Sequence, residues 1–190
     1  MRKLIYTLGV TLDGYAEAPG GSIEWSRPDD ELFAFHVERA RGVGLEVYGR
    51  GLYEDMFAFW PTADQQPDAS PQQIEFAKIW GATPKVVFSS TLESVREPAR
   101  LVRSNRDEDV VAETRRLKAE DGADMDIGGA TIAAPVVRAG LVDEYWLFTY
   151  PLLVGGGKPF FPTLDNWVNL RALETREFET ATLRRFEVVR

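Results

Sequence analysis

The amino-acid sequence predicts an α/β fold with a mixed, mainly parallel sheet, helices on both faces and an antiparallel hairpin at its C-terminal end. Three observations support this prediction. Short apolar segments alternate with helix-like segments along most of the chain, which is the order found in parallel βαβ units. Several apolar segments end in a glycine turn that begins a helix. Two alternating segments, 170–178 and 182–189, close the chain and are typical of paired strands at a sheet edge.

Five apolar segments are predicted as the strands of the parallel part of the sheet. Each segment is short and leads into a turn or the start of a helix. The strands are expected at residues 4–10, 45–48, 85–89, 124–127 and 144–150.

Helices are predicted between these strands from their start and stop signals. Pro28 and the two acids after it suit a first helical turn, and Gly122 and Gly140 each close a helix. The expected helices are one after Pro28, a short one at 49–54, and three at 70–79, 107–120 and 130–139. Residues 58–70 are rich in Pro, Asp and Gln and are predicted as a surface loop. No long linker interrupts the chain, so residues 1–190 are predicted as one domain.

Charge and composition exclude several classes of function. The chain carries 22 Lys and Arg against 30 Asp and Glu, a formal net charge of −8. This balance argues against non-specific binding of nucleic acid, which needs a basic surface. An anionic ligand would therefore need a local positive site. The apolar runs are too short to span a bilayer and no signal-peptide segment is recognised, so a cytoplasmic protein without membrane contact is expected.

Two residue types that often build reactive centres are scarce. Cysteine is absent, which excludes disulfides and thiolate chemistry. His36 is the only histidine, which argues against a histidine-built metal centre, so no metal is expected. His36 itself is interpreted as a packed or surface residue within a helix.

The sequence Gly128-Gly129-Ala130-Thr131 follows a predicted strand and opens a helix. Paired glycines let a backbone approach a bulky anion, and a helix start offers unpaired N–H groups with a partial positive charge. A pyrophosphate would fit such a turn. The alternative is a plain tight turn, and it has equal weight on the dipeptide alone because the GxGxxG fingerprint is absent.

A second group of residues at strand ends suits a phosphate. Gly49-Arg50-Gly51 turns from a strand into a helix, and Ser89-Ser90-Thr91 follows the next strand. In a parallel sheet such strand ends share the edge where α/β proteins bind ligands. A guanidinium with hydroxyl groups suits the 2′-phosphate of NADPH. Taken singly, a solvated arginine and a serine turn are the plainer interpretations, as is an exposed turn lysine for Lys158.

The segment from Trp25 to Asp30 offers a candidate acid. A carboxylate in the first helical turn beside Trp25, Phe33 and Phe35 would be partly desolvated, which raises its pKa toward acid–base use. The alternative is that Asp29 and Asp30 only cap the helix and complement its dipole. From the residues alone, the capping role is favoured.

Taken in order, six segments resemble the dihydrofolate reductase-like superfamily. The resemblance is closest to the reductase domain of bifunctional riboflavin-biosynthesis deaminase-reductases and to its stand-alone bacterial relatives. Each segment is weak alone, but the ordered set is specific and spans most of the chain. The segments are 11–15 (TLDGY), 49–54 (GRGLYE), 87–92 (VFSSTL), 127–130 (IGGA), 140–145 (GLVDEY) and 151–161. The resemblance implies a dihydrofolate reductase-like, three-layer α/β/α fold.

The resemblance implies a site for NADPH. Leu8, Gly9 and Val10 would line the nicotinamide pocket at the first strand. The adenosine end and its 2′-phosphate would be held by Gly49, Arg50, Gly51, Ser89, Ser90 and Thr91. The pyrophosphate would be seated by Gly128, Gly129, Ala130 and Thr131.

The resemblance also implies a substrate site beside the cofactor. Asp13 and Tyr15 would lie on a flexible loop over the active site. The WxxPxD pattern that begins at Trp25 resembles the stretch that carries the active-site carboxylate of dihydrofolate reductases. Asp30 would then bind or help protonate the substrate ring, with Thr149 in support. The stretch from this carboxylate to the next glycine turn is longer than in dihydrofolate reductases.

The function implied is an NADPH-dependent reductase that transfers hydride to a small heterocycle, as 5-amino-6-(5-phosphoribosylamino)uracil reductases or dihydrofolate reductases do. The chain lacks the cysteines that a zinc deaminase would need. Two alternatives stay open: a reductase of a different small substrate, and a non-catalytic ligand-binding or assembly module that keeps the fold. A homodimer is expected, because related reductase domains commonly pair and the last strands present an apolar edge.

Overall fold

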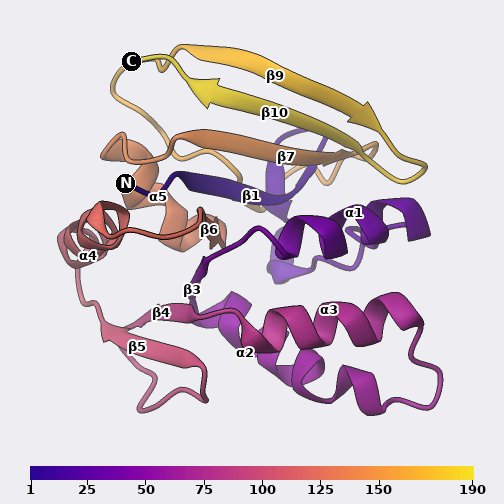
Figure 1. Ribbon diagram of the computed structural model, residues 1–190. Helices are drawn as coiled ribbons and strands as arrows, with labels where there is room; N and C mark the ends of the chain where they lie inside the picture. Colours follow the sequence, from indigo (N-terminus) through magenta and orange to yellow (C-terminus); the bar gives the residue numbers. More distant parts are fainter.

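The computed structural model describes residues 1–190 and is built around one eight-stranded sheet (Figure 1). Its strands, in spatial order, are β5 (Ala99–Arg103), β4 (Lys85–Ser89), β3 (Leu45–Gly49), β6 (Met125–Gly128), β1 (Leu4–Thr11), β7 (Glu144–Tyr150), β10 (Thr182–Val188) and β9 (Leu170–Glu177). The neighbours from β5 to β7 are all parallel, whereas β10 is antiparallel to both β7 and β9. The predicted α/β class, mainly parallel sheet and C-terminal hairpin are confirmed.

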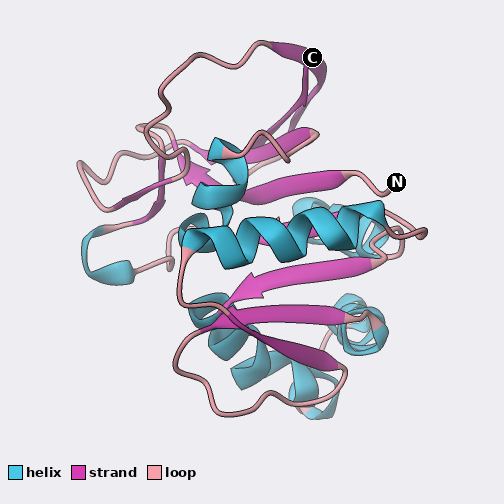
Figure 2. Ribbon diagram, turned by 90° about the vertical axis from the view of Figure 1, so that its left-hand side faces the viewer, coloured by secondary structure: helices cyan, strands magenta, loops and turns pink.

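Helices lie on both sides of this sheet (Figures 1 and 2). One face carries α1 (Asp30–Ala40), α2 (Arg50–Phe59) and α3 (Pro71–Ala82), and the other carries α4 (Asp107–Ala119) and α5 (Ala130–Arg138). Neighbouring side chains on β7 point alternately to these two faces. Trp146 packs with Leu32 of α1, while Tyr145 joins the cluster that contains α5, because successive strand residues point to opposite faces.

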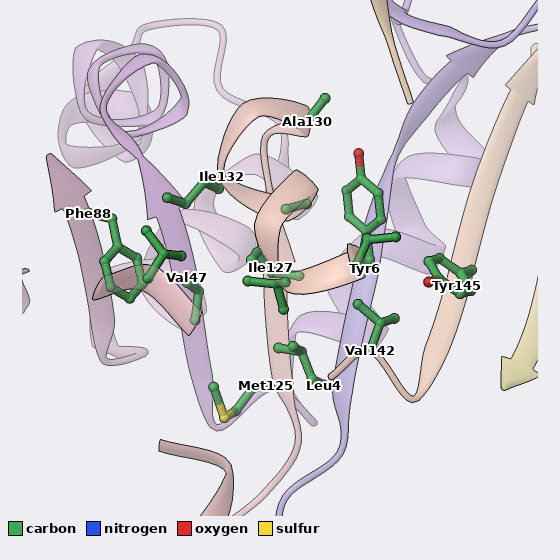
Figure 3. Close-up of a cluster of buried hydrophobic side chains, with 14 of the residues drawn as sticks. Leu4, Tyr6, Val47, Phe88, Met125, Ile127, Ala130, Ile132, Val142 and Tyr145 are labelled. Atoms are coloured by element: carbon green, nitrogen blue, oxygen red, sulfur yellow. The ribbon is translucent and has the colours of Figure 1, made fainter. Parts of the chain in front are cut away.

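The larger core lies between the sheet and the α4–α5 side (Figure 3). Leu4 and Tyr6 of β1 and Met125 and Ile127 of β6 are fully buried there. The hydroxyl of Tyr6 donates to the carbonyl oxygen of Phe160 over 2.9 Å, and the two rings stack with centroids 4.2 Å apart. Each such apolar side chain contributes about 1.5–3 kcal/mol on burial. The first strand is thereby anchored in the middle of the molecule.

β1 has a parallel partner on each side, and both partners come from late in the chain. Ile5 is paired with Asp126 of β6 and with Glu144 of β7. Parallel strands need a crossover connection, and here the crossovers place most of the chain between β1 and its neighbours. The carboxyl ends of β3, β4 and β6, and the turns that follow them, consequently lie at one edge of the sheet.

Three short elements differ from the sequence-based expectations. β5 was not predicted, because its arginines break the apolar pattern and it pairs only with β4 at the sheet edge. β2 (Tyr15–Glu17) and β8 (Lys158–Pro159) form a separate two-stranded sheet and are too short for any periodicity.

The predicted loop at 58–70 is wrong in its first half. α2 continues to Phe59, and a 3₁₀ helix follows at Trp60–Gln65. The ring of Trp60 packs against Phe33, with centroids 6.2 Å apart, and against Phe76, with centroids 4.4 Å apart. These tertiary contacts outweigh the local loop composition. None of the helices has both the length and the apolar run needed to cross a bilayer.

Candidate functional site

The carboxyl ends of β3, β4 and β6 surround a cavity of about 340 Å³, here called the strand-end cavity. It is lined by Glu17, Gly49, Arg50, Gly51, Leu52, Phe88, Ser89, Ser90, Thr91, Ser104, Gly129, Ala130, Thr131, Ile132 and Lys158. The residues predicted for the adenosine end and for the pyrophosphate therefore meet in one place, apart from Gly128. They come from three separate turns, so the sheet topology alone assembles them.

Two helices begin at this cavity without a side-chain cap. Gly49 is the N-cap of α2 and Gly129 is the N-cap of α5, and neither helix has a side chain that accepts from its first N–H groups. α1 and α3, which lie elsewhere, are capped by Asp29 and Ser70. Uncapped first turns leave N–H donors and the positive end of each helix dipole available. Two such ends in one cavity favour an anionic ligand.

The turn at Gly128-Gly129 depends on glycine at Gly129 for its backbone conformation and at Gly128 for close packing. Gly129 has a φ of +96°, a conformation that side chains other than hydrogen disfavour. A Cβ on Gly128 would lie 2.5 Å from Cδ2 of Leu52 on α2. The two glycines therefore bring the start of α5 close to α2, and the two helix ends close to each other.

Arg50 is the main cationic side chain at the rim of the strand-end cavity. Its Nη1 donates to Oγ1 of Thr91 over 3.0 Å, and its Nε lies 3.0 Å from Oε1 of Glu54. The Ser89 hydroxyl accepts from the backbone N–H groups of Thr91 and Leu92. Ser89 thus shapes the turn, and Thr91 holds the guanidinium against it. The planar fork of arginine suits two-point binding of a phosphate.

Glu17 and Lys158 bring a second charged pair into the strand-end cavity. Lys158 Nζ lies 2.8 Å from Glu17 Oε1, across the small sheet formed by β2 and β8. Gly157 allows this approach, because a Cβ there would lie 2.0 Å from the Glu17 carbonyl oxygen. Lys158 was interpreted as an ordinary exposed lysine, and Glu17 and Ser104 were not singled out. Only the pairing of segments distant in sequence reveals them.

The residues predicted for the nicotinamide pocket lie outside the strand-end cavity, on β1. Gly9 faces Trp25, Ser26 and Tyr150: a Cβ on Gly9 would be 3.3 Å from the Ser26 Cβ and from the Tyr150 ring. The rings of Trp25 and Tyr150 meet edge to face, with centroids 5.5 Å apart. The absence of a side chain on Gly9 therefore lets this aromatic pair sit close to the strand.

Leu8 and Val10 lie on the same stretch of β1, and Thr149 lies beside it on β7. Val10 is buried and is paired with Thr149 of β7. Leu8 packs partly buried against the larger core. Trp25 and Thr149 thus lie beside the end of β1, and their contact with a substrate stays a prediction.

Asp13 and Tyr15 occupy the turn that follows β1. The Asp13 carboxylate accepts from the Thr11 hydroxyl over 2.6 Å and from the backbone N–H groups of Val154 and Gly155. The hydrogen bond from Thr11 is the largest influence that lowers the pKa of Asp13. Tyr15 begins β2 and pairs with β8. Both residues tie the glycine-rich turn at 155–157 to β1, so their assignment to substrate binding stays a prediction.

Asp29 and Asp30 have different environments. Asp29 accepts from the N–H of Leu32 over 2.8 Å and from the backbone and hydroxyl of Thr180. The bond from Leu32 contributes most to lowering the pKa of Asp29. Asp30 is exposed at the start of α1 and does not line the strand-end cavity. The favoured capping role is therefore found at Asp29, the alternative of a desolvated carboxylate is not found at Asp30, and the catalytic role of Asp30 stays a prediction.

The sheet order defines an α/β protein with a dihydrofolate reductase-like fold. The family model of the RibD C-terminal domain matches residues 2–183. The chain therefore belongs to the RibD C-terminal domain family, a family with a reductase fold.

Relatives of known sequence agree with this membership. The uncharacterized protein YyaP of Bacillus subtilis (strain 168) is 28% identical over 183 residues, which cover 96% of this chain and 92% of that protein. A second uncharacterized protein of the same strain, YwjB, is 27% identical over 188 residues, which cover 95% of this chain and 94% of that protein.

Solved structures share the fold at low sequence identity. A putative riboflavin biosynthesis protein from Shewanella sp. PV-4 has a TM-score of 0.68 at 20% identity, with each chain fully covered. A deaminase/5-amino-6-(5-phosphoribosylamino)uracil reductase from Thermotoga maritima has a TM-score of 0.64 at 13% identity, covering 99% of this chain and 57% of that one. Dihydrofolate reductase from Enterococcus faecalis, complexed with NADP(H), has a TM-score of 0.62 at 16% identity, covering 98% and 96%.

Proposed function

We propose that this protein is an NADPH-dependent reductase that transfers hydride to a small heterocyclic substrate. The observation that carries the proposal is the strand-end cavity, where two uncapped helix N-termini and Arg50 converge. Because the chain carries a formal net charge of −8, an anionic ligand needs local positive groups such as these. The neighbouring structures, one of which is complexed with NADP(H), support the same ligand.

The residues present fit a dinucleotide. The N–H groups at the starts of α2 and α5 would hold the pyrophosphate, with Gly129 permitting close approach. Arg50 and Thr91 would hold the 2′-phosphate, which distinguishes NADPH from NADH. Gly9 would face the nicotinamide, and Leu8 and Val10, whose side chains pack toward the larger core, would line the pocket with their backbone.

The chemistry that the bound cofactor supplies is hydride donation from its nicotinamide ring. The chain's own contribution is positioning and exclusion of water. Trp25 and Tyr150, which meet at Gly9, would hold a planar ring beside β1, with Thr149 in the next strand. Asp30 or a bound water would supply the proton, and Asp30 would have to become shielded when substrate binds, because it is exposed in this structure.

Titration with NADPH and NADH tests the cofactor assignment. Tryptophan quenching and energy transfer to the nicotinamide should report micromolar NADPH binding and much weaker NADH binding. Arg50→Ala should remove most of the difference, a loss of about 1.5–3 kcal/mol for a charged hydrogen bond. Arg115→Ala, an exposed arginine on α4 outside the cavity, is the matched control and should bind as the wild type does. Failure of both dinucleotides to bind at millimolar concentration would overturn the assignment.

A second candidate is a non-catalytic ligand-binding module with the same fold. It is favoured by the exposure of Asp30, because no buried acid stands at the predicted substrate site. The two candidates are separated by substrate-dependent oxidation of NADPH across a panel of pterins, aminopyrimidines and quinones. Binding of NADPH without turnover of any of these compounds would favour the module.

A homodimer is also part of the proposal. β9 pairs only with β10 and leaves one edge of the sheet uncovered. Apolar side chains are exposed on and beside this edge: Trp167, Val168, Leu170, Leu173 and Val189. Exposed apolar patches of this kind mark contact surfaces, and the occupant proposed is a second copy of this chain.

A further inference from the structure

A second cavity, here called the α1 cavity, lies under α1 and shares no residue with the strand-end cavity. Its volume is about 250 Å³. It is lined by residues of α1, α2, α3, the 3₁₀ helix at 60–65 and the first residues of β3 and β6. One side is an aromatic wall of Phe33, Trp60 and Phe76, in which the planes of Phe33 and Trp60 are 9° apart. Such a wall suits a flat, apolar ring.

The opposite side of the α1 cavity is charged. Arg39 Nη2 lies 2.5 Å from Asp126 Oδ2, and Lys85 Nζ lies 3.4 Å from Glu46 Oε2. The side chains of Asp126 and Glu46 are only 10% and 13% exposed. Nevertheless Asp126 Oδ1 and Arg39 Nε have no hydrogen-bond partner within the chain, and Glu46 Oε2 has no hydrogen bond beside its ion pair with Lys85. Three polar side chains with atoms that make no hydrogen bond thus border one cavity.

Unpaired buried polar atoms are costly, at about 1–3 kcal/mol each, and most native proteins satisfy them. Burial raises the pKa of both Asp126 and Glu46. It lowers the pKa of His36, which also lines the cavity, to about 4, with a further lowering from Arg39. Each shift favours the uncharged form of its group. The carboxylate oxygens Asp126 Oδ1 and Glu46 Oε2 are acceptors, so the cavity is suited to a molecule that donates hydrogen bonds, and its burial disfavours a further charge.

We propose that the α1 cavity is a second ligand site, which binds an uncharged single-ring aromatic amine. The ring would lie against Phe33, Trp60 and Phe76, and the N–H groups would point to Asp126 and Glu46. Apolar walls with a few convergent polar groups are the usual construction of a small-molecule site. The volume, just below the usual range of about 300–1,000 Å³, limits the ligand to one ring.

Aniline and toluene form a matched pair of probes, because toluene carries a methyl group where aniline carries its amino group. Calorimetric titration of the wild-type protein at neutral pH should show aniline binding at least ten times more tightly than toluene. Saturating NADPH should leave aniline binding unchanged, since the two cavities have no residue in common. Equal affinities, competition with NADPH, or no aniline binding at millimolar concentration would each overturn the proposal.

Filling the α1 cavity gives a second, independent test. Ala40 lines the cavity and Ala34 does not, although both lie on α1. Ala40→Leu should weaken aniline binding at least tenfold, whereas Ala34→Leu should leave it unchanged. Circular dichroism checks that both variants fold. If Ala40→Leu does not fold, the comparison of aniline with toluene on the wild-type protein tests the proposal. Undiminished binding by a folded Ala40→Leu variant would place aniline elsewhere and overturn the proposal.

Discussion

Gly129 illustrates how one residue controls the shape of the strand-end cavity. Its φ of +96° sets the direction in which α5 leaves β6. Any other residue at this position must adopt a conformation that costs about 1–3 kcal/mol. Because the first N–H groups of α5 have no side-chain cap, a change in this turn also changes where those donors point.

Gly129→Ala is therefore expected to lower the free energy of unfolding by about 1–3 kcal/mol and to weaken NADPH binding. Urea unfolding and the dinucleotide titration measure the two effects. Gly51→Ala is the matched control for stability, because Gly51 lies in α2 at an ordinary φ with open space around its Cβ position. It should be neutral or slightly stabilising. Equal losses of stability in the two variants would contradict the role given to the positive φ.

His36 is expected to make stability depend on pH. It packs against Phe148, with ring centroids 4.6 Å apart, and burial followed by the charge of Arg39 lowers its pKa to about 4. The unfolded chain binds this proton near pH 6.5, so the contribution of neutral His36 is complete above that pH. It is lost as the pH falls toward 4, by up to about 3 kcal/mol.

Comparison with His36→Phe isolates this dependence. Asp126 and Glu46 have raised pKa values, so their protonation acts in the opposite direction and is common to both proteins. The difference in unfolding free energy between wild type and variant should therefore change across pH 6.5 to 4, with the wild type losing more stability toward acid. Parallel pH profiles would show that His36 is not held neutral.

At the scale of elements, the small sheet of β2 and β8 supplies the part of the strand-end cavity that sequence patterns did not predict. The Glu17–Lys158 pair lies on the cavity side of this sheet. Both side chains are partly exposed, so the pair itself adds little stability. In the proposed function, the pair holds the ammonium group of Lys158 at the strand-end cavity, where the anionic cofactor would bind.

Lys158→Met is expected to weaken NADPH binding a few-fold, and Glu17→Gln is expected to strengthen it by a similar factor. The first variant removes the cation, and the second removes the carboxylate that competes for it. Both effects should shrink as the salt concentration rises, because partly exposed charges are screened. Dinucleotide titrations at two ionic strengths measure this. Changes of the same sign in both variants would indicate a merely structural pair.

The sequence predicted the long elements well and the short ones poorly. Strands such as 85–89, with an apolar run at 86–88, and helices such as 107–120, with clear ends, needed no tertiary information. In β5, Arg100 and Arg103 interrupt the apolar residues without a regular alternation, and the 3₁₀ helix at 60–65 depends on aromatic contacts with α1 and α3. Whether such short elements form depends on their contacts with distant segments. A local sequence pattern carries no information about those contacts.

The candidate site was also predictable only in part, where its residues follow a predicted strand. Glycine and arginine turns after predicted strands carry a local signal, and the parallel topology then brings those turns together. Glu17 and Lys158 are 141 residues apart and carry no such signal. The position of Asp30 could not be judged either, because the exposure of a side chain in a first helical turn depends on what packs over it.

At the scale of the whole molecule, the uncovered edge at β9 predicts the oligomeric state. Trp167 is 90% exposed, and a large aromatic side chain in this position commonly anchors an interface. Trp167→Ser is expected to shift the protein from dimer toward monomer in sedimentation velocity. Leu153→Ser is the control, because Leu153 is 71% exposed but lies in the loop after β7. A wild type that sediments as a monomer at high concentration would contradict the homodimer.

The position of β1 has a consequence for the biosynthesis of the protein. Its first residue is Leu4, yet its two partners begin at Met125 and Glu144. A growing polypeptide leaves the ribosome from its N-terminal end, so β1 emerges before both partners and stays unpaired until β6, which begins at Met125, has been made. Contacts between such distant segments fold slowly. During translation the apolar strand at the centre of the mature sheet is thus the segment exposed longest, and the one that chaperones would most need to protect.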